Sequence, residues 1–322
     1  MADRYHRAAM RAATIRDGEI AVQEHPDPRP QTGELLVRVR AAGLNGADMV
    51  QLAGGYPAPP GAPPDIPGLE LAGEVVETGD GVERFEPGDR VMSIVAGGGQ
   101  AELAVVNERV AMPVPDELDW IAAGGVPEVF FTAHDALFTQ AGLTVGERVL
   151  VHGAAGGVGT AAVQLATMAG ARVTATVRDE HCRELVTALA VNAIAPDGFG
   201  EAGPFDVILE LVGAPNWPAN LDALALRGRI VVIGVGAGAQ IDLDLRKLMF
   251  KRARILASTM RARPLEEKAI ATRLVEKAVL PGFASGDLSV PVAATYPLDE
   301  VAAAYDRFKA GGKLGKIVLE IQ

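Results

Sequence analysis

Cysteine is almost absent from this chain, which has Cys182 alone among its 322 residues. A single thiol cannot form an internal disulfide or supply the several thiolates of a zinc or iron-sulfur site. Long apolar runs are missing too, because no window approaches the ~18 uncharged apolar residues of a membrane span. The N-terminal residues also lack the apolar core of a signal peptide. We therefore expect a cytoplasmic protein with no membrane partner.

Basic residues are scarce relative to acidic ones. Lysine and arginine total 30 against 41 aspartate and glutamate, which gives a formal net charge of −11. Such a chain repels phosphate backbones, so nucleic acid is not an expected partner. Hydrophobic residues, at 49%, and the 37 glycines are abundant. The length predicts about two domains with large cores, and the glycines indicate tight turns or close backbone approaches.

Two different strand patterns divide the chain. Up to about residue 115, short strands alternate with glycine and proline, a pattern typical of an antiparallel barrel or sandwich. These strands are 35–39, 73–76, 90–95 and 101–106. Beyond residue 120, continuous apolar strands alternate with helical patterns, which indicates a parallel sheet covered on both faces. Those strands are 148–152, 172–177, 205–209 and 228–233.

The C-terminal residues return to the strand pattern of the first part. The final ~35 residues are too few for a domain of their own, so we expect them to rejoin the N-terminal domain. The predicted organisation is an outer domain of residues 1–125 and 285–322, with an α/β domain of residues 126–284 inserted into it. Residues 1–9 precede the first strand and receive no role.

A glycine-rich turn follows the strand that ends at His152. Ala154, Gly156 and Gly159 occupy the three small-residue positions of the dinucleotide-binding fingerprint, ahead of a helical pattern. Amides at the start of that helix would face a pyrophosphate. The candidate contacts in this turn are Ala155, Gly156, Gly157 and Val158. Alanine at the first glycine position breaks the strict pattern, and the alternative is a structural turn in an unrelated α/β fold.

The end of the second parallel strand indicates which dinucleotide is bound. An NAD site needs a carboxylate about twenty residues after the turn to bind the ribose hydroxyls. Val177 stands at that position, and Arg178 after it could pair with a 2′-phosphate. Asp179 is interpreted as the N-cap of the next helix. The sequence therefore favours NADPH over NADH as cofactor.

Five short segments spread over both predicted domains resemble a known family. They are residues 44–48, 54–57, 97–101, 127–128 and 248–252. With the glycine turn, they make the chain similar to the medium-chain dehydrogenase/reductase superfamily over nearly its whole length. The closest resemblance is to the zinc-independent quinone oxidoreductases of the tumour-suppressor-inducible type. It implies an α/β fold: a GroES-like, mostly antiparallel β domain plus an inserted Rossmann domain with a doubly wound parallel sheet.

The zinc-ligand positions of the superfamily provide a test. Where zinc members have their first cysteine, this chain has Asn45, and where they have histidine, it has Leu69. Glu128 stands near the third ligand position, and the four-cysteine structural lobe is missing. Leucine cannot ligate zinc, and no soft ligand remains at the first position. We therefore expect no catalytic metal and exclude a mechanism in which zinc polarises an alkoxide.

The resemblance implies further site residues in two groups. Tyr56 and Asn45 match residues beside the nicotinamide and the acceptor, and are the catalytic candidates. The additional cofactor-binding candidates are Thr132, Val212, Gly213, Gly234, Val235 and Lys316. Lys316 matches a basic residue near the pyrophosphate. Packing, capping and surface roles are the alternatives for these side chains.

The predicted function is that of an NADPH:quinone oxidoreductase, which transfers a hydride from nicotinamide C4 to a quinone. A quinone is electron-poor, so positioning and exclusion of water would be the main contributions of the protein. One rival is reduction of the activated double bond of an enal, enone or enoyl thioester, which would make the Tyr56 hydroxyl essential. Another is a low-turnover NADPH-binding sensor. The resemblance also implies a homodimer that pairs sheet edges near residues 255–258.

Overall fold

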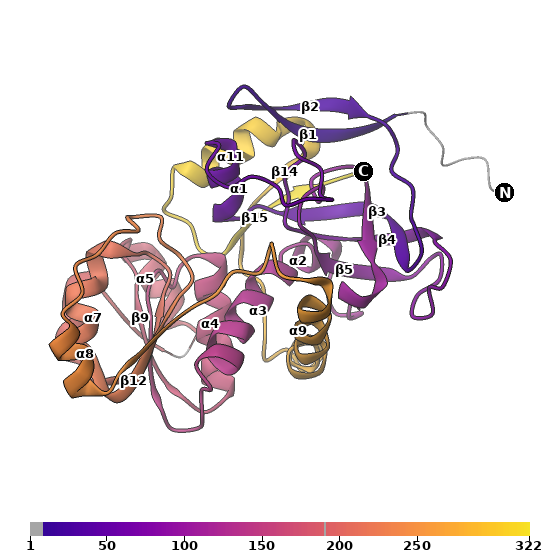
Figure 1. The fold of residues 1–322 in the computed structure, drawn as a ribbon. Helices are drawn as coiled ribbons and strands as arrows, with labels where there is room; N and C mark the ends of the chain where they lie inside the picture. Colours follow the sequence, from indigo (N-terminus) through magenta and orange to yellow (C-terminus); the bar gives the residue numbers. More distant parts are fainter. Residues whose placement is uncertain (1–8, 190) are drawn as a thin grey trace. The chain divides into compact units, whose positions relative to one another are not determined.

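A computed structural model describes residues 9–189 and 191–322. The chain forms two compact units, each shown in Figure 1 by the colours of its segments. The antiparallel unit comprises the residues up to Glu128 together with Arg261–Gly311 and Lys316–Gln322, and the parallel unit comprises Val129–Met260 and Gly312–Gly315. The sequence assigns no role to residues 1–9, and residues 1–8 of this segment lie outside the described part of the chain.

The antiparallel unit is built on a seven-stranded sheet with the order β14-β15-β3-β4-β5-β7 and with β6 paired to β3. All its strand pairs are antiparallel except β14 with β15, and β1 and β2 form a separate hairpin. The strands are β1 (Met10–Arg16), β2 (Glu19–His25), β3 (Glu34–Gly43), β4 (Glu70–Thr78), β5 (Arg90–Ile94), β6 (Leu103–Asn107), β7 (Ala111–Pro113), β14 (Val292–Pro297) and β15 (Lys316–Glu320). The helices are α1 (Gly46–Leu52), α2 (Trp120–Ala123), α9 (Leu265–Ala278), α10 (Leu280–Ser285) and α11 (Val301–Lys309).

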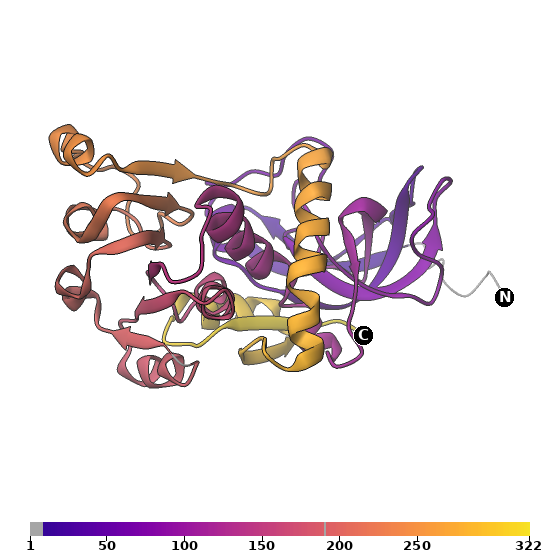
Figure 2. The ribbon, with the colours of Figure 1, turned by 90° about the horizontal axis from the view of Figure 1, so that it is seen from below.

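The chain returns to the antiparallel unit at Arg261, which corrects the boundary predicted at residue 285. Figure 2 shows α9 as the long orange helix beside the strands of this unit, where it packs against β7 and the short turn before it. Arg273 on α9 donates to the carbonyl oxygen of Ala111 at 2.7 Å. The helical pattern of α9 resembles that of the preceding α/β segment, so the sequence alone did not reveal that it changes unit.

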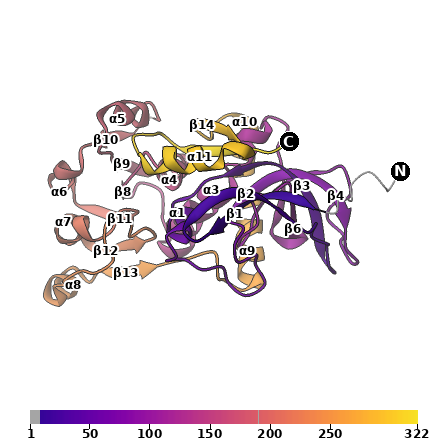
Figure 3. The same ribbon diagram turned by 90° about the horizontal axis from the view of Figure 1, so that it is seen from above.

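The parallel unit contains six strands with the order β10-β9-β8-β11-β12-β13, all parallel, which can be followed by their labels in Figure 3. The strands are β8 (Arg148–Val151), β9 (Arg172–Thr176), β10 (Asn192–Ile194), β11 (Phe205–Glu210), β12 (Leu224–Val232) and β13 (Arg254–Ala257). The helices are α3 (Pro127–His134), α4 (Gly157–Met168), α5 (Glu180–Thr187), α6 (Phe199–Ala202), α7 (Trp217–Ala223) and α8 (Leu245–Lys251). Counted along this unit, the strand order is 3-2-1-4-5-6, the order of a Rossmann sheet.

The parallel strands are buried as their apolar runs predict. Val149, Ile208 and Ile230, on three neighbouring strands, have no exposed surface. The N-cap prediction is confirmed as well, because Asp179 accepts a hydrogen bond of 2.8 Å from the amide of Cys182 at the start of α5. The predicted α/β fold class, with a GroES-like and a Rossmann-type domain, is confirmed. Within the described residues, no helix is both long and apolar enough to span a bilayer.

Candidate active site

The glycine turn joins β8 to α4 and has the close packing that its small residues predict. A Cβ atom on Gly159 would lie 2.6 Å from the Cα of Ala154, so only glycine lets α4 approach the turn this closely. A Cβ on Gly156 would meet only the carbonyl oxygen of Gly153, at 3.4 Å. Gly159 is therefore required by packing, whereas the Cα of Gly156 borders open space.

The candidate pyrophosphate contacts lie together at the start of α4. This helix begins at Gly157, with Gly156 as its N-cap, so its first turn presents backbone N–H groups that have no acceptor within the helix. The amide of Gly315 donates to the carbonyl oxygen of Ala155 at 2.7 Å, which places residues 312–315 on one side of the turn. The region is suited to bind an anion.

An exposed arginine, Arg178, follows the end of β9. Val177 is buried, whereas Arg178 is exposed, and its guanidinium has no hydrogen bond or ion pair with any described residue. Asp179 is occupied as the N-cap of α5. Arg183 donates to the carbonyl oxygens of Val177 and Arg178, both at 3.3 Å, and so stabilises this segment. Arg178 is therefore available to an external anion.

The turns after β11 and β12 are in contact with each other. The carbonyl oxygen of Val212 accepts a hydrogen bond of 2.9 Å from the amide of Ala237. Gly213 has φ 115°, and a Cβ atom there would lie 3.0 Å from the Cα of Val235. The structure thus brings Val212, Gly213, Gly234 and Val235 to the carboxyl edge of the parallel sheet. Thr132 lies half-buried on α3 of the same unit.

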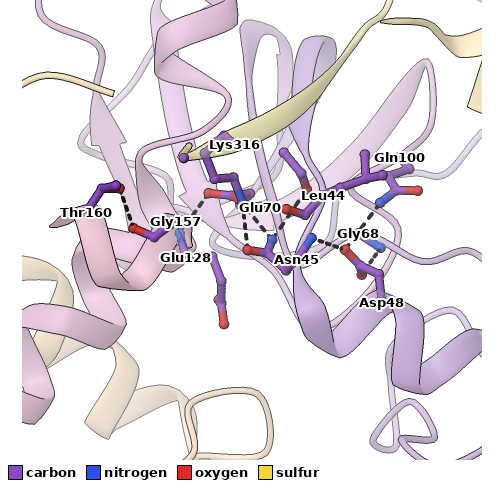
Figure 4. Close-up of polar contacts among 12 residues, drawn as sticks. Leu44, Asn45, Asp48, Gly68, Glu70, Gln100, Glu128, Gly157, Thr160 and Lys316 are labelled. Carbon is purple, nitrogen blue, oxygen red and sulfur yellow. Dashed lines mark hydrogen bonds and ion pairs between the residues drawn. The ribbon is translucent and has the colours of Figure 1, made fainter. Parts of the chain in front are cut away.

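The antiparallel unit contains a buried polar cluster around Glu70, drawn in Figure 4. The wholly buried Glu70 carboxylate accepts hydrogen bonds from Lys316 Nζ at 2.6 Å, Asn45 Nδ2 at 2.9 Å and the amide of Glu128 at 2.9 Å. Lys316 Nζ also donates to Asn45 Oδ1 and to the carbonyl oxygen of Leu44, each at 2.7 Å. A Cβ on Gly43 would lie 2.4 Å from Glu70 Oε1, so a glycine is needed beside this carboxylate.

Comparison with known proteins identifies the family. Residues 31–116 match the family model of the alcohol dehydrogenase GroES-like domain, and residues 157–277 match that of the zinc-binding dehydrogenase. A quinone oxidoreductase of Rattus norvegicus is 33% identical over 307 residues, which cover 91% of this chain and 90% of the relative. The chain belongs to the medium-chain dehydrogenase/reductase (MDR) superfamily, of the quinone oxidoreductase type.

Other relatives agree with this membership. An acryloyl-coenzyme A reductase of Metallosphaera sedula is 32% identical over 329 residues, covering 92% of this chain and 95% of the relative. The crystal structure of AibC has a TM-score of 0.85 and 28% sequence identity, and the match covers 99% of this chain and 97% of that one. The MDR chain is therefore an oxidoreductase that acts on small molecules, in a family that binds a nicotinamide dinucleotide.

Lys316 is enclosed within the polar cluster of this MDR protein. Its ammonium group has three donor hydrogens and three acceptors, namely Glu70, Asn45 and Leu44, and the residue is only 2% exposed. A buried carboxylate such as Glu70 needs an opposite charge or hydrogen bonds nearby. Lys316 serves that purpose with all three donor hydrogens, and its predicted contact with a pyrophosphate stays a prediction. Asn45 is occupied in the same way, since both ends of its amide bind within the cluster.

The Lys316 ammonium group of this cluster interacts with three carboxyl groups, those of Glu70, Glu128 and Asp48. Burial, and secondarily the charge of Glu70, raises the pKa of Glu128 to about 8, against the lowering effect of Lys316. Burial likewise raises the pKa of Asp48 to about 6. The Glu128 side chain points away from the Lys316–Glu70 pair in Figure 4, and its carboxyl group has no hydrogen bond with any described residue. Glu128 is therefore mostly protonated at neutral pH.

Tyr56 is held by an arginine that the sequence did not indicate. Arg261 is 5% exposed and donates to the carbonyl oxygens of Tyr56 and Ala96 and to Gln51 Oε1, each at 2.8 Å. Its guanidinium also lies over the Tyr56 ring, 4.8 Å from the centroid. Burial, with a smaller contribution from the charge of Glu128, raises the pKa of Tyr56. The half-buried Tyr56 hydroxyl forms no hydrogen bond within the described chain.

The positions that carry zinc ligands in the superfamily have other side chains here. Leu69 lies in the core, 2% exposed, and Asn45 is occupied by Lys316 and Glu70. Among the residues that the structure describes, no three histidine, cysteine, aspartate or glutamate side chains form a group that could hold a metal ion.

Proposed function

We propose that this MDR enzyme is a zinc-independent NADPH:quinone oxidoreductase. The observation that carries the choice of cofactor is the exposed guanidinium of Arg178, which is unpaired within the described part of the chain. It follows Val177, at the position where an NAD site has a carboxylate. A planar guanidinium suits a 2′-phosphate because it forms forked, charge-assisted hydrogen bonds. The relatives named quinone oxidoreductase support the choice of acceptor.

The residues of the parallel unit fit such a cofactor. The open space beside Gly156 and the unbonded amides of the first turn of α4 suit a pyrophosphate, with Ala155, Gly157 and Val158 as its other neighbours. The turns at 212–213 and 234–235, with Thr132, are the proposed contacts of the nicotinamide riboside. When bound, NADPH supplies the hydride at nicotinamide C4, and the chain's own task is to bind and orient the reactants.

We assign Tyr56 to the binding site of the quinone, which accepts the hydride. Its ring can stack on a flat quinone, its hydroxyl is free to donate, and Arg261 holds it in place. Asn45 is assigned a supporting role, because its amide is occupied by Glu70 and Lys316. Zinc independence is supported by the Lys316 ammonium 2.7 Å from Asn45 Oδ1, since a positive charge there would repel a divalent cation.

Reduction of an activated carbon-carbon double bond is the second candidate. It is favoured by the acryloyl-coenzyme A reductase relative and by Glu128, whose raised pKa of about 8 keeps a proton available in the unit that holds Tyr56. Hydride addition to such a bond leaves an enolate that must be protonated, whereas a reduced quinone needs little acid catalysis.

The deciding experiment measures oxidation of NADPH and NADH by metal-stripped protein with 1,2-naphthoquinone, 1,4-benzoquinone, an enal and an enoyl thioester. We expect NADPH-dependent turnover with the quinones. Turnover of the alkenes alone would assign the enzyme to the double-bond reductases. Tight NADPH binding without turnover of any acceptor would instead indicate a sensor.

We also propose a homodimer formed through β13. This strand ends the parallel sheet and pairs with β12 alone among the described strands. Ile255 on it is 36% exposed, and an unpaired edge of this kind can add a strand from a second copy. Light scattering should give twice the 33.5 kDa mass of one chain, and the monomer mass would contradict the proposal.

A further inference from the structure

The last residue of β11, Glu210, is a wholly buried carboxylate at the carboxyl edge of the parallel sheet. Its Oε1 atom accepts hydrogen bonds from the amides of Val212 at 2.7 Å and Gly213 at 2.8 Å. Asn220 Nδ2 donates to Oε2 at 2.7 Å, and Asn216 Nδ2 lies 3.2 Å from Oε1. A buried carboxyl group without such donors would be strongly unfavourable, so these hydrogen bonds compensate for its removal from water.

The backbone of Glu210 binds the second turn. Its carbonyl oxygen accepts hydrogen bonds from the amides of Ile233 at 3.0 Å and Gly234 at 3.1 Å. One residue thus contacts the turn after β11 through its side chain and the turn after β12 through its main chain. Both turns carry proposed cofactor contacts.

His152, directly after the neighbouring strand β8, and Asn220 on α7 support the carboxylate. Since Asn220 donates Nδ2–H to Glu210, its Oδ1 faces His152 Nε2 at 2.7 Å and must accept. Burial lowers the pKa of His152, so the ring is neutral, with its proton on Nε2. His152 Nδ1 then accepts from the Thr176 hydroxyl at 2.9 Å. Hydrogen bonds therefore run in one direction from the end of β9 to Glu210.

The chain of hydrogen bonds crosses the place where the strand order of the sheet reverses. β8 and β11 are neighbours, with β9 on one side and β12 on the other, and ligands of open α/β sheets bind outside such a switch point. We propose that Glu210 is a positioning residue of the dinucleotide site, which fixes the turns at 212–213 and 234–235 and is itself held by Asn220 and His152. This inference rests on the proposed binding of NADPH.

The test compares Glu210→Ala and Glu210→Gln with Glu147→Gln as a matched control. Glu147 is a carboxylate of the same unit whose partner, Arg229 at 2.5 Å, is nearly buried, but it precedes β8 at the opposite edge of the sheet. Dissociation constants for NADPH, thermal midpoints and amide hydrogen exchange of the cofactor-free protein are measured for each. Loss of bonds to a charged acceptor should weaken NADPH binding by about tenfold in Glu210→Ala.

We expect faster exchange at residues 211–216 in Glu210→Ala and unchanged NADPH binding in Glu147→Gln, even where both lose thermal stability. Glu210→Gln keeps one acceptor oxygen but turns a donor toward Asn220. It should bind NADPH with intermediate affinity and move the His152 proton to Nδ1, which ¹⁵N NMR detects. If Glu210→Ala does not fold, the affinity and NMR spectrum of Glu210→Gln decide.

Two results would overturn the proposal. One is NADPH affinity of the folded Glu210 variants within twofold of the unmodified protein. The other is an equal loss of affinity in Glu147→Gln at an equal loss of thermal midpoint. If the unmodified protein binds no NADPH, the proposed function fails instead, and the exchange rates still report whether Glu210 orders the two turns.

Discussion

Individual side chains set the charge distribution on which the proposed chemistry depends. Lys316 pairs with the buried carboxylate of Glu70 at 2.6 Å, and its remaining donors are engaged by Leu44 and Asn45. Arg178 is the converse case, an exposed cation that has no partner among the described residues. The difference lies in burial, since an enclosed charge must be paired within the protein and an exposed one is free to bind a ligand.

Replacing Arg178 with alanine should raise the KM for NADPH by about tenfold, because the charged hydrogen bonds to a 2′-phosphate would be lost. The KM for NADH should stay within twofold, since NADH has no such phosphate. Arg172→Ala, at the opposite end of β9 and also exposed, is the control and should leave both values unchanged. Equal effects of Arg178→Ala on NADH and NADPH would contradict the assignment.

Replacing Tyr56 with phenylalanine should separate the two candidate reactions. Quinone reduction should fall by less than about fivefold, whereas reduction of an enoyl thioester should fall by about a hundredfold or more if the hydroxyl is the proton donor. Tyr296→Phe, at a half-buried tyrosine on β14, provides the matched control for kcat. A hundredfold loss with quinones would show that their reduction also needs this proton.

The helix α4 and the turn before it form the element on which the proposed cofactor binding depends. Its two glycines have different roles, because Gly159 is required by packing whereas Gly156 borders open space. The same helix presents its unbonded amides only if it approaches the turn closely, so packing and ligand binding are linked at this element.

Alanine at Gly159 should lower the free energy of unfolding by about 1–3 kcal/mol, because its Cβ would lie 2.6 Å from the Ala154 Cα. Alanine at Gly156 should leave stability nearly unchanged but weaken NADPH binding, since its Cβ would enter the space proposed for the pyrophosphate. Urea unfolding and NADPH titration of both variants check the two expectations. Full NADPH affinity in Gly156→Ala would contradict the proposed place of the pyrophosphate.

At the scale of the whole molecule, the buried acidic cluster links folding stability to pH. The folded chain retains the Glu128 proton up to a pKa of about 8, whereas the unfolded chain loses it near the ordinary value of 4.5. The folded state therefore binds more protons between these values, and stability falls as pH rises. The charged groups that act on Glu128 are Glu70, Lys316, Asp48 and Arg261.

Glu128→Gln should therefore flatten the loss of stability between pH 6 and 8, by at most about 1.4 kcal/mol per pH unit. This window starts at the pKa of about 6 of Asp48, so the contribution of that group fades as pH rises, and it is shared by both proteins. The free energy of urea unfolding at pH 5.5, 6.5, 7.5 and 8.5 measures the effect, with the exposed Glu77→Gln as control. Parallel pH profiles for Glu128→Gln and the unmodified protein would contradict the raised pKa.

Local features of the fold could be predicted from the sequence. The apolar runs of the parallel strands, the glycine turn and the N-cap at Asp179 depend on residues within one or two elements, so their signals are contained in short stretches of sequence. The role of Arg178 was predicted in the same way, from its place after a strand, and it stays a prediction. The roles predicted for the remaining site residues came from family resemblance, and those of Tyr56, Thr132 and the two turns stay predictions.

The amino-acid sequence by itself determined the α/β class, the strand patterns and the turn that suits a dinucleotide, because each follows from periodicity or local backbone geometry. Only the tertiary structure decided which residues the buried charged groups contact. Lys316 reaches Glu70 across 246 residues, and Arg261 reaches Tyr56 across 205, with no motif linking either pair. Burial makes such pairing necessary, but the fold alone selects the partner.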